Sequence, residues 1–316
     1  MGDPAGVGVG LLRTCQHPGV AIDLGRIGVW SFDLDLQPVS RAQEAVGELE
    51  ALGYGALWIP EAVGREVMSN AALLLAGGRR IVVATGIANL WARDAMSMAA
   101  GQKTILSGYP DRFLLGVGVS HQSAVEGMRG HSYDRPLSTM RAYLDAMDAA
   151  VYIADPPASE PVRVLAALGP KMLELARDRA AGAHPYFVPL EHTVVAREAL
   201  GPDRLLAPEQ AVVLETDPAT ARELARSHMK TYLGLQNYTN KLRRLGYGDE
   251  DLADGGSDRL VDAIVAWGDA STVAARVQAH LDAGADHVCI QVIHGDRRTL
   301  PTRQWQELAS TLALSP

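Results

Sequence analysis

Apolar segments of strand length alternate with amphipathic helix patterns along almost the whole chain, and this alternation constrains the fold more than any other feature. Eight segments have the apolar pattern of buried strands: residues 27–32, 56–59, 81–87, 113–118, 162–168, 183–187, 205–214 and 287–293. A helix pattern follows each of them. Since parallel strands must be joined by crossover segments, usually helices, the alternation predicts an α/β fold with parallel strands. Eight such units predict a single (β/α)8 TIM barrel.

The main alternative is a doubly wound open sheet, which often carries the dinucleotide fingerprint Gly-x-Gly-x-x-Gly after its first strand. No such motif follows residues 27–32, and the nearest imitation, Gly116-Val117-Gly118, lies in the fourth strand. This absence and the strand count favour the barrel. The predicted domain covers residues 25–316, after an irregular leader at 1–24. Residues 231–268 are expected to form a mainly helical insertion before the last strand–helix units.

Composition excludes several classes of function. The 316 residues include 29 Lys and Arg against 37 Asp and Glu, and the net charge of −8 argues against nucleic acid or an acidic membrane as partner. No apolar run is long enough to span a bilayer, and the first 25 residues lack the pattern of a signal peptide. Cys15 and Cys289 match no metal-binding spacing. A cytoplasmic protein without membrane or nucleic-acid partners is expected.

Ligands of a barrel bind at the carboxyl ends of its strands, so the residues at these ends are the candidates for the active site. His121 follows the fourth strand and is the first candidate for acid–base chemistry, because an imidazole titrates near neutral pH. Glu61, after the second strand, is the other candidate. The alternatives are a rim or core histidine and a surface carboxylate. His121, Glu126 and His131 match no compact metal site, so no metal is expected.

Two further strand ends have features of a binding site. Gly86 lies in an extended segment that continues to Asn89, which indicates a strand bulge or a close backbone approach to a flat ligand. Gly169-Pro170-Lys171 opens a helix directly after the fifth strand, where free backbone N–H groups and the Lys171 charge favour a phosphate. An ordinary bulge and an ordinary helix start would give the same two patterns.

Five segments taken together resemble a known family. They are Thr-Gly-Ile-Ala-Asn-Leu-Trp-Ala-Arg-Asp at 85–94, Arg-Phe-Leu-Leu-Gly-Val-Gly-Val-Ser-His at 112–121, Leu-Gly-Pro-Lys-Met-Leu-Glu-Leu-Ala at 168–176, Gly-Ala-His-Pro-Tyr at 182–186 and Gly-Ala-Asp-His-Val at 284–288. From about residue 26 to 293 the chain resembles the luciferase-like monooxygenase superfamily, specifically its oxidoreductases that depend on the deazaflavin coenzyme F420.

The resemblance implies a homodimer of (β/α)8 barrels, each with an insertion and a coenzyme at the carboxyl face. It also implies a cis peptide bond at Gly86–Ile87 behind the deazaflavin ring. The positions that match the family's coenzyme site, together with Tyr186 at the end of the sixth strand, are Glu61, Gly86, Ile87, Asn89, Gly118, Val119, Ser120, Leu168, Gly169 and Lys171. Of these, Leu168, Gly169 and Lys171 are expected near the coenzyme's side chain and phosphate.

Two departures from the family pattern restrict the substrates that can be expected. Relatives that oxidise glucose 6-phosphate carry a catalytic histidine where this chain has Ala62, and His121 replaces their acidic residue after the fourth strand. A sugar-phosphate dehydrogenase is therefore not expected. The leading hypothesis is hydride transfer between F420 and an unidentified small organic substrate, with His121 or Glu61 as proton donor. The alternatives are an FMN-dependent monooxygenase of the same superfamily and a non-catalytic deazaflavin-binding protein.

Overall fold

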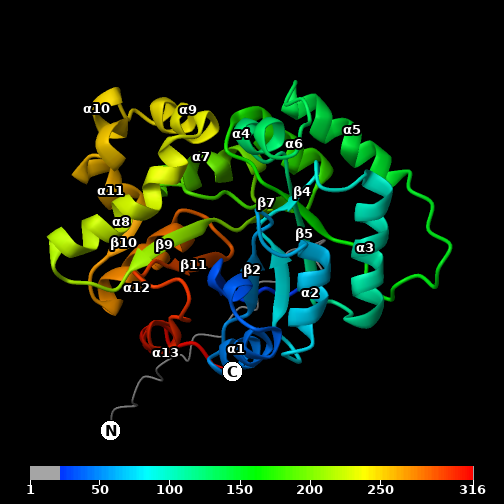
Figure 1. Ribbon diagram of the computed structural model, residues 1–316, viewed down its shortest axis with the longest axis horizontal. Helices are drawn as coiled ribbons and strands as arrows, with labels where there is room; N and C mark the ends of the chain where they lie inside the picture. Colours follow the sequence, from blue (N-terminus) through cyan, green and yellow to red (C-terminus); the bar gives the residue numbers. More distant parts are fainter. Residues whose placement is uncertain (1–21, 316) are drawn as a thin grey trace, which may run out of the picture.

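A computed structural model describes residues 22–315 and contains one sheet in which every paired strand is parallel (Figure 1). Its strands are β1 (Ile27–Trp30), β2 (Ala56–Ile59), β3 (Val82–Thr85), β4 (Ala88–Asn89), β5 (Phe113–Gly118), β6 (Arg163–Leu165), β7 (Gly182–Ala183), β8 (Leu205–Leu206), β9 (Glu209–Val213), β10 (Val265–Trp267) and β11 (Val288–Val292). The prediction of parallel strands alternating with helices is confirmed.

The order of the strands shows that the sheet curls back on itself. It runs β10-β9-β11-β1-β2-β3-β5-β6-β7-β8, with β4 paired to β5. β8 stands at one end of this order and β9 near the other, yet only Ala207 and Pro208 separate them in the chain. The carboxyl ends of distant strands are therefore brought to one rim.

Helices cover the outside of the sheet (Figure 1). They are α1 (Val39–Ala51), α2 (Val67–Leu75), α3 (Ala95–Gly108), α4 (Gln122–Gly127), α5 (Pro136–Asp148), α6 (Pro170–Arg179), α7 (Leu190–Leu200), α8 (Pro218–Leu233), α9 (Gln236–Arg244), α10 (Asp249–Leu252), α11 (Asp258–Ile264), α12 (Ala270–Asp282) and α13 (Thr302–Thr311), with the 3₁₀ turns η1 (Asp33–Leu36) and η2 (Ala253–Gly255). Asp94, Asp217 and Asp269 begin α3, α8 and α12 by accepting backbone N–H bonds.

Both faces of the strands are buried, which explains why they read as continuous apolar runs. In β3, Val83 packs with the helices, whereas Val82 and Ala84 belong to a second cluster on the opposite face with Trp30 and Trp58. Ile22 and Leu24 also join this second cluster. These residues of the expected irregular leader have no regular secondary structure, but they are buried; residues 1–21 lie outside the described part of the chain.

Three local predictions differ from the structure. The third strand is divided into β3 and β4, and the seventh into β8 and β9, with Pro208, which has no N–H to donate, at the second break. The segment 231–268, expected to be mainly helical, also contains β10, which pairs with β9. A strand of three residues is too short to give a periodic pattern, so pairing with β9 decided its conformation.

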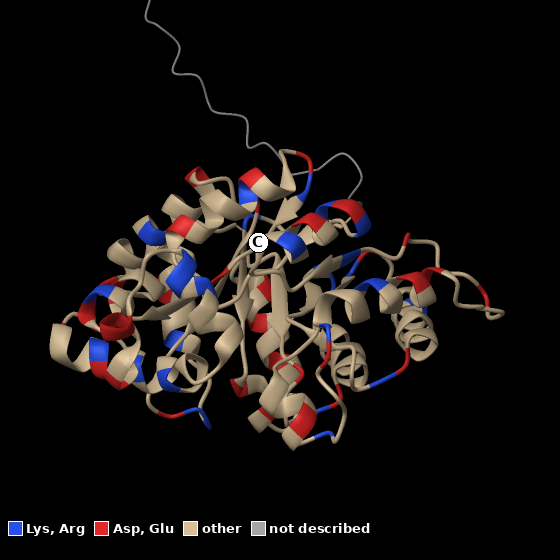
Figure 2. Ribbon diagram, turned by 90° about the horizontal axis from the view of Figure 1, so that it is seen from above, with Lys and Arg blue, Asp and Glu red and all other residues tan. Residues whose placement is uncertain are grey.

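Charged residues of both signs are interspersed along the helices seen in Figure 2. Arg222 of α8, for example, pairs with Asp258 and Asp262 of α11. Between residues 22 and 315, no helix combines the length and apolar character that a membrane span requires.

Candidate active site

A cavity of about 830 Å³ opens at the carboxyl ends of the strands. Eleven of the twelve candidate residues line it: Glu61, Gly86, Ile87, Asn89, Val119, Ser120, His121, Leu168, Gly169, Lys171 and Tyr186. The exception is Gly118, where a Cβ atom would lie 2.5 Å from the Ile87 side chain. Gly118 therefore allows Ile87 to pack closely against β5, and it is not among the residues that line the cavity; its contact with a ligand stays a prediction.

The third strand is interrupted where the cavity begins. β3 ends at Thr85, the Gly86–Ile87 peptide bond is cis, and β4 resumes at Ala88. The expected cis bond is thus confirmed. The Thr85 hydroxyl donates to the carbonyl of Gly116 at 2.8 Å, and the Gly116 N–H donates back to the hydroxyl oxygen. This side-chain bridge holds β3 to β5 immediately before the interruption.

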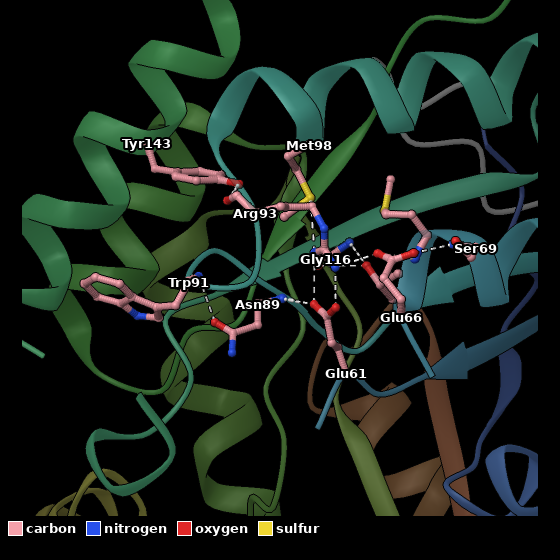
Figure 3. A network of polar contacts seen from close by, with 11 residues as sticks. Glu61, Glu66, Ser69, Asn89, Trp91, Arg93, Met98, Gly116 and Tyr143 are labelled. Atoms are coloured by element: carbon pink, nitrogen blue, oxygen red, sulfur yellow. Dashed lines mark hydrogen bonds and ion pairs between the residues drawn. The ribbon is translucent and has the colours of Figure 1, made fainter. Parts of the chain in front are cut away.

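Glu61 is held in a buried polar network rather than facing the cavity as a free carboxylate (Figure 3). The Arg93 guanidinium donates to both Glu61 oxygens, and the Asn89 N–H donates to Oε2 at 2.7 Å. Arg93 also pairs with Glu66, which accepts N–H bonds at the start of α2. The network fixes the position of Asn89, at the edge of the cavity.

His121 lies at the mouth of the cavity, as the residue before α4. Its Nδ1 is 3.1 Å from Oδ1 of Asn237, a carbonyl oxygen that can only accept, so Nδ1 carries the proton and Nε2 the lone pair. Burial lowers the pKa of His121 below its usual value, and the bond to Asn237 partly offsets this. The imidazole is thus neutral at pH 7 and can accept a proton at Nε2.

One end of the cavity is basic. Lys171 on α6 and Arg244 on α9 line it. Arg129, after α4, lines the cavity as well, and Glu61 is the single acidic side chain among the lining residues that the structure describes. Because Arg93 neutralises Glu61, the cavity has an excess of positive charge in a chain of net charge −8. A Cβ at Gly169 would be 3.5 Å from Nη2 of Arg244, so this guanidinium lies against the start of α6. An anionic group of a ligand is favoured at this end.

Helix α9 contributes residues that the sequence analysis missed, because it lies in the presumed insertion. Asn237, Tyr238 and Arg244 of α9 all line the cavity. Buried Lys241 anchors the helix by donating to the carbonyl of Phe187, whose N–H donates to Glu209 at 3.0 Å. Burial lowers the pKa of Lys241 to about 7 and raises that of Glu209 to about 8. The basic last turn of α9 was the one available signal in the sequence.

The Arg93–Glu61 pair gives a prediction for stability. Their side chains are 11% and 5% exposed. Arg93→Ala leaves a buried carboxylate without its partner, and we expect the free energy of unfolding to fall by about 3–5 kcal/mol in urea denaturation. The double variant Arg93→Ala/Glu61→Gln, in which the stranded charge is replaced by an amide, should recover part of that loss. A loss below about 1 kcal/mol in Arg93→Ala would contradict the prediction.

Comparison with known proteins places this site in context. The family model described as luciferase-like monooxygenase matches residues 24–287. Among curated proteins, one named as a coenzyme F420-dependent oxidoreductase from Mycobacterium tuberculosis is 29% identical over 194 residues, which are 51% of this chain and 54% of the relative. The chain thus matches about half the length of that relative.

Solved structures show the same fold at low sequence identity. An F420-dependent secondary alcohol dehydrogenase, solved with an F420–acetone adduct, is 14% identical with a TM-score of 0.74 over 92% of this chain and 99% of that one. The F420-dependent tetrahydromethanopterin reductase of Methanopyrus kandleri is 15% identical, with a TM-score of 0.68 over 91% and 98%. A type II Baeyer–Villiger monooxygenase of Pseudomonas putida, in complex with FMN, is 16% identical, with a TM-score of 0.67 over 90% and 95%.

Proposed function

The chain belongs to the luciferase-like monooxygenase family, and from this membership we propose that it is an oxidoreductase that transfers hydride between coenzyme F420 and a small organic substrate. The observation that carries the proposal is the cavity at the strand ends, which unites the interrupted third strand, a basic end and a half-buried imidazole. We also propose that the curled sheet and its helices form a (β/α)8 barrel, with residues 231–268 as an insertion.

The residues of the cavity fit a coenzyme of this kind. A volume of about 830 Å³ is within the range of small-molecule sites. Lys171 and Arg244 would hold a phosphate at the basic end, and Gly86, Ile87 and Asn89 would support the ring. When bound, the deazaflavin supplies hydride transfer at C5, and the protein supplies orientation and proton handling.

His121 carries the proton in this proposal. In the neutral form its Nε2 accepts a proton, and in the protonated form it donates one, while Asn237 holds Nδ1–H and fixes the ring. Glu61 was the second candidate donor, but both of its oxygens are engaged by Arg93. We therefore assign Glu61 a positioning role: it holds the backbone of Asn89, which would support the ring of the coenzyme.

Parallel fluorescence titrations with F420 and FMN test the proposal. We expect tighter binding of F420 than of FMN. Preference for FMN would favour the monooxygenase alternative, which the FMN-containing structural relative supports. Binding of F420 without turnover of any acceptor would favour a non-catalytic coenzyme-binding protein.

The basic end gives a prediction for coenzyme affinity. Lys171→Ala and Arg244→Ala should each weaken F420 binding by about five- to tenfold at low salt, and by less at high salt, because exposed charges are screened. Lys103→Ala is the matched control, since it removes one positive charge from outside this cavity. An unchanged affinity at low salt in both cavity variants would place the phosphate elsewhere.

The homodimer and the cytoplasmic location expected from the sequence remain predictions. For the first, sedimentation velocity at micromolar concentration should give twice the mass of the 316-residue chain. The mass of a single chain at that concentration would contradict the dimer.

A further inference from the structure

Two buried hydrogen-bonding atoms, on residues that line the cavity, have no partner in the protein. Among residues 22–315, six buried side-chain atoms lack a hydrogen-bond partner, and only Nε1 of Trp30 and Nε2 of His184 belong to residues that line the cavity. Trp30 is 2% exposed and His184 1%. Since buried polar groups normally find partners, this coincidence with the cavity indicates that the partner is a ligand atom.

The two nitrogens converge on one point, beside Gly86. A Cβ atom built on Gly86 would lie 2.5 Å from Nε1 of Trp30 and 2.9 Å from Nε2 of His184. Any side chain at this position would collide with both rings, so the glycine leaves room in front of them. The glycine at the interruption of the third strand therefore leaves the space in front of these two buried nitrogens free of a side chain.

The chemistry of the pair is complementary. An indole Nε1–H can only donate. Nδ1 of His184 lies 2.7 Å from the carbonyl oxygen of Ala207, so it carries the proton, and Nε2 can only accept. The His184 ring is also stacked on Trp58 at 4.2 Å, which fixes its plane. Burial lowers the pKa of His184 to about 4, so the ring stays neutral at pH 7.

We propose that Trp30 and His184 form a subsite for one hydroxyl group of the substrate, whose oxygen accepts from Trp30 and whose proton is donated to His184. A carbonyl or ether oxygen would satisfy Trp30 alone, and a carboxylate has no proton for His184. Phe32 and Tyr186 pack on Trp30, with ring centroids 4.6 and 4.9 Å away. The structure thus points to a neutral hydroxyl on an apolar or aromatic skeleton. That this hydroxyl belongs to the substrate rests on the proposed function.

The test compares benzyl alcohol with its isomer anisole, which has the same atoms but no hydroxyl proton to donate. Indole N–H resonances are followed by ¹H–¹⁵N NMR on the coenzyme-free and the F420-loaded protein, and Trp30→Phe assigns the Trp30 signal. We expect benzyl alcohol to shift this signal and to bind about tenfold more tightly than anisole. The Trp305 signal, from an unpartnered buried indole outside the cavity, should not move.

Variants separate the hydroxyl contact from general packing. Trp30→Phe and His184→Phe keep an aromatic ring and should each reduce the preference for benzyl alcohol to near one. Trp305→Phe should keep it at about tenfold. Because His184→Phe also loses the bond to Ala207 and can fail to fold, Trp30→Phe alone decides the result in that case.

Three outcomes overturn the proposal. The first is equal binding of benzyl alcohol and anisole by the wild type. The second is a preference for benzyl alcohol that survives in Trp30→Phe. The third is a Trp30 signal that shifts when F420 binds and that benzyl alcohol no longer moves in the F420-loaded protein. The last would assign the subsite to a coenzyme hydroxyl. A failure of F420 to bind, with the benzyl alcohol shift intact, would refute the proposed function and leave the hydroxyl subsite standing.

Discussion

His121→Ala is expected to lower turnover by about 10²- to 10⁴-fold, the usual contribution of a general acid or base, while F420 affinity stays within a few-fold. The reason is that His121 lines the cavity and Asn237 holds its Nδ1, which leaves the lone pair on Nε2. His121→Gln should not restore the rate, because an amide forms hydrogen bonds but does not exchange the proton. Single-turnover reduction of the coenzyme by a donor substrate, the direction in which neutral His121 accepts the proton, measures the effect.

The pH profile distinguishes proton transfer from simple lining of the cavity. Because burial lowers the pKa of His121 below its usual value of about 6.5, the base form persists at neutral pH and is lost as the pH falls through that lowered value. Asn237→Ala removes the partner of Nδ1 and should lower the rate less than His121→Ala, with a change in the acidic limb of the profile. An unchanged single-turnover rate in His121→Ala would eliminate the proton-transfer role.

The second prediction is that the free energy of unfolding falls steeply as the pH is lowered from about 6.5 to about 4. Burial lowers the pKa of five histidines far below 6.5: to about 4 for His184, His192, His228 and His287, and to about 3 for His280. In the unfolded chain each titrates near 6.5, so the unfolded state binds more protons throughout this window. The stabilisation is complete above pH 6.5 and is lost as the pH falls.

The magnitude is large because the five contributions act together. Each can supply up to about 3 kcal/mol, so their sum is comparable with the net stability of about 5–15 kcal/mol that is typical of a folded protein. The neutral state is required by the contacts: Nδ1 of His287 donates to the carbonyl of Gly25, and Nε2 accepts from Trp58 at 3.0 Å. A proton on Nε2 would break the bond from Trp58.

Urea denaturation at about pH 7.5 and about pH 5 measures the loss. His287→Gln should reduce the number of protons taken up on unfolding by about one, although it also destabilises the protein. Trp305→Phe, which changes the buried core but no titrating group, should lower stability equally at both pH values. Equal unfolding free energies of the wild type at the two pH values would show that these histidines are not buried in the neutral form.

The alternation of strand and helix patterns was enough to predict the parallel α/β architecture, because periodicity and burial are local properties of the chain. The same alternation identified the strand ends. Strand ends and the family resemblance together gave twelve candidate residues, and eleven of them line the cavity. The resemblance to a family added the cis bond at Gly86–Ile87, which local patterns do not reveal. It also added Gly118, whose packing against Ile87 became visible only in three dimensions.

The partners of the chemical groups depended on the tertiary structure. His121 and Asn237 are 116 residues apart in the chain, and they meet because α9 is anchored over the rim of the sheet through Lys241. No periodic pattern relates such positions, so α9 was assigned to an insertion.

Glu61 shows the same division between local pattern and tertiary contact. Its place after the second strand was predictable, but its engagement by Arg93 was not, and that contact changes its proposed role from proton donor to positioning residue. Likewise, the glycine at position 86 was visible in the sequence, whereas the two unpartnered nitrogens behind it come from β1 and from the segment after β7. The sequence by itself determined which residues stand at strand ends. The curling of the sheet, which brings ends more than a hundred residues apart to one rim, decided which of them touch.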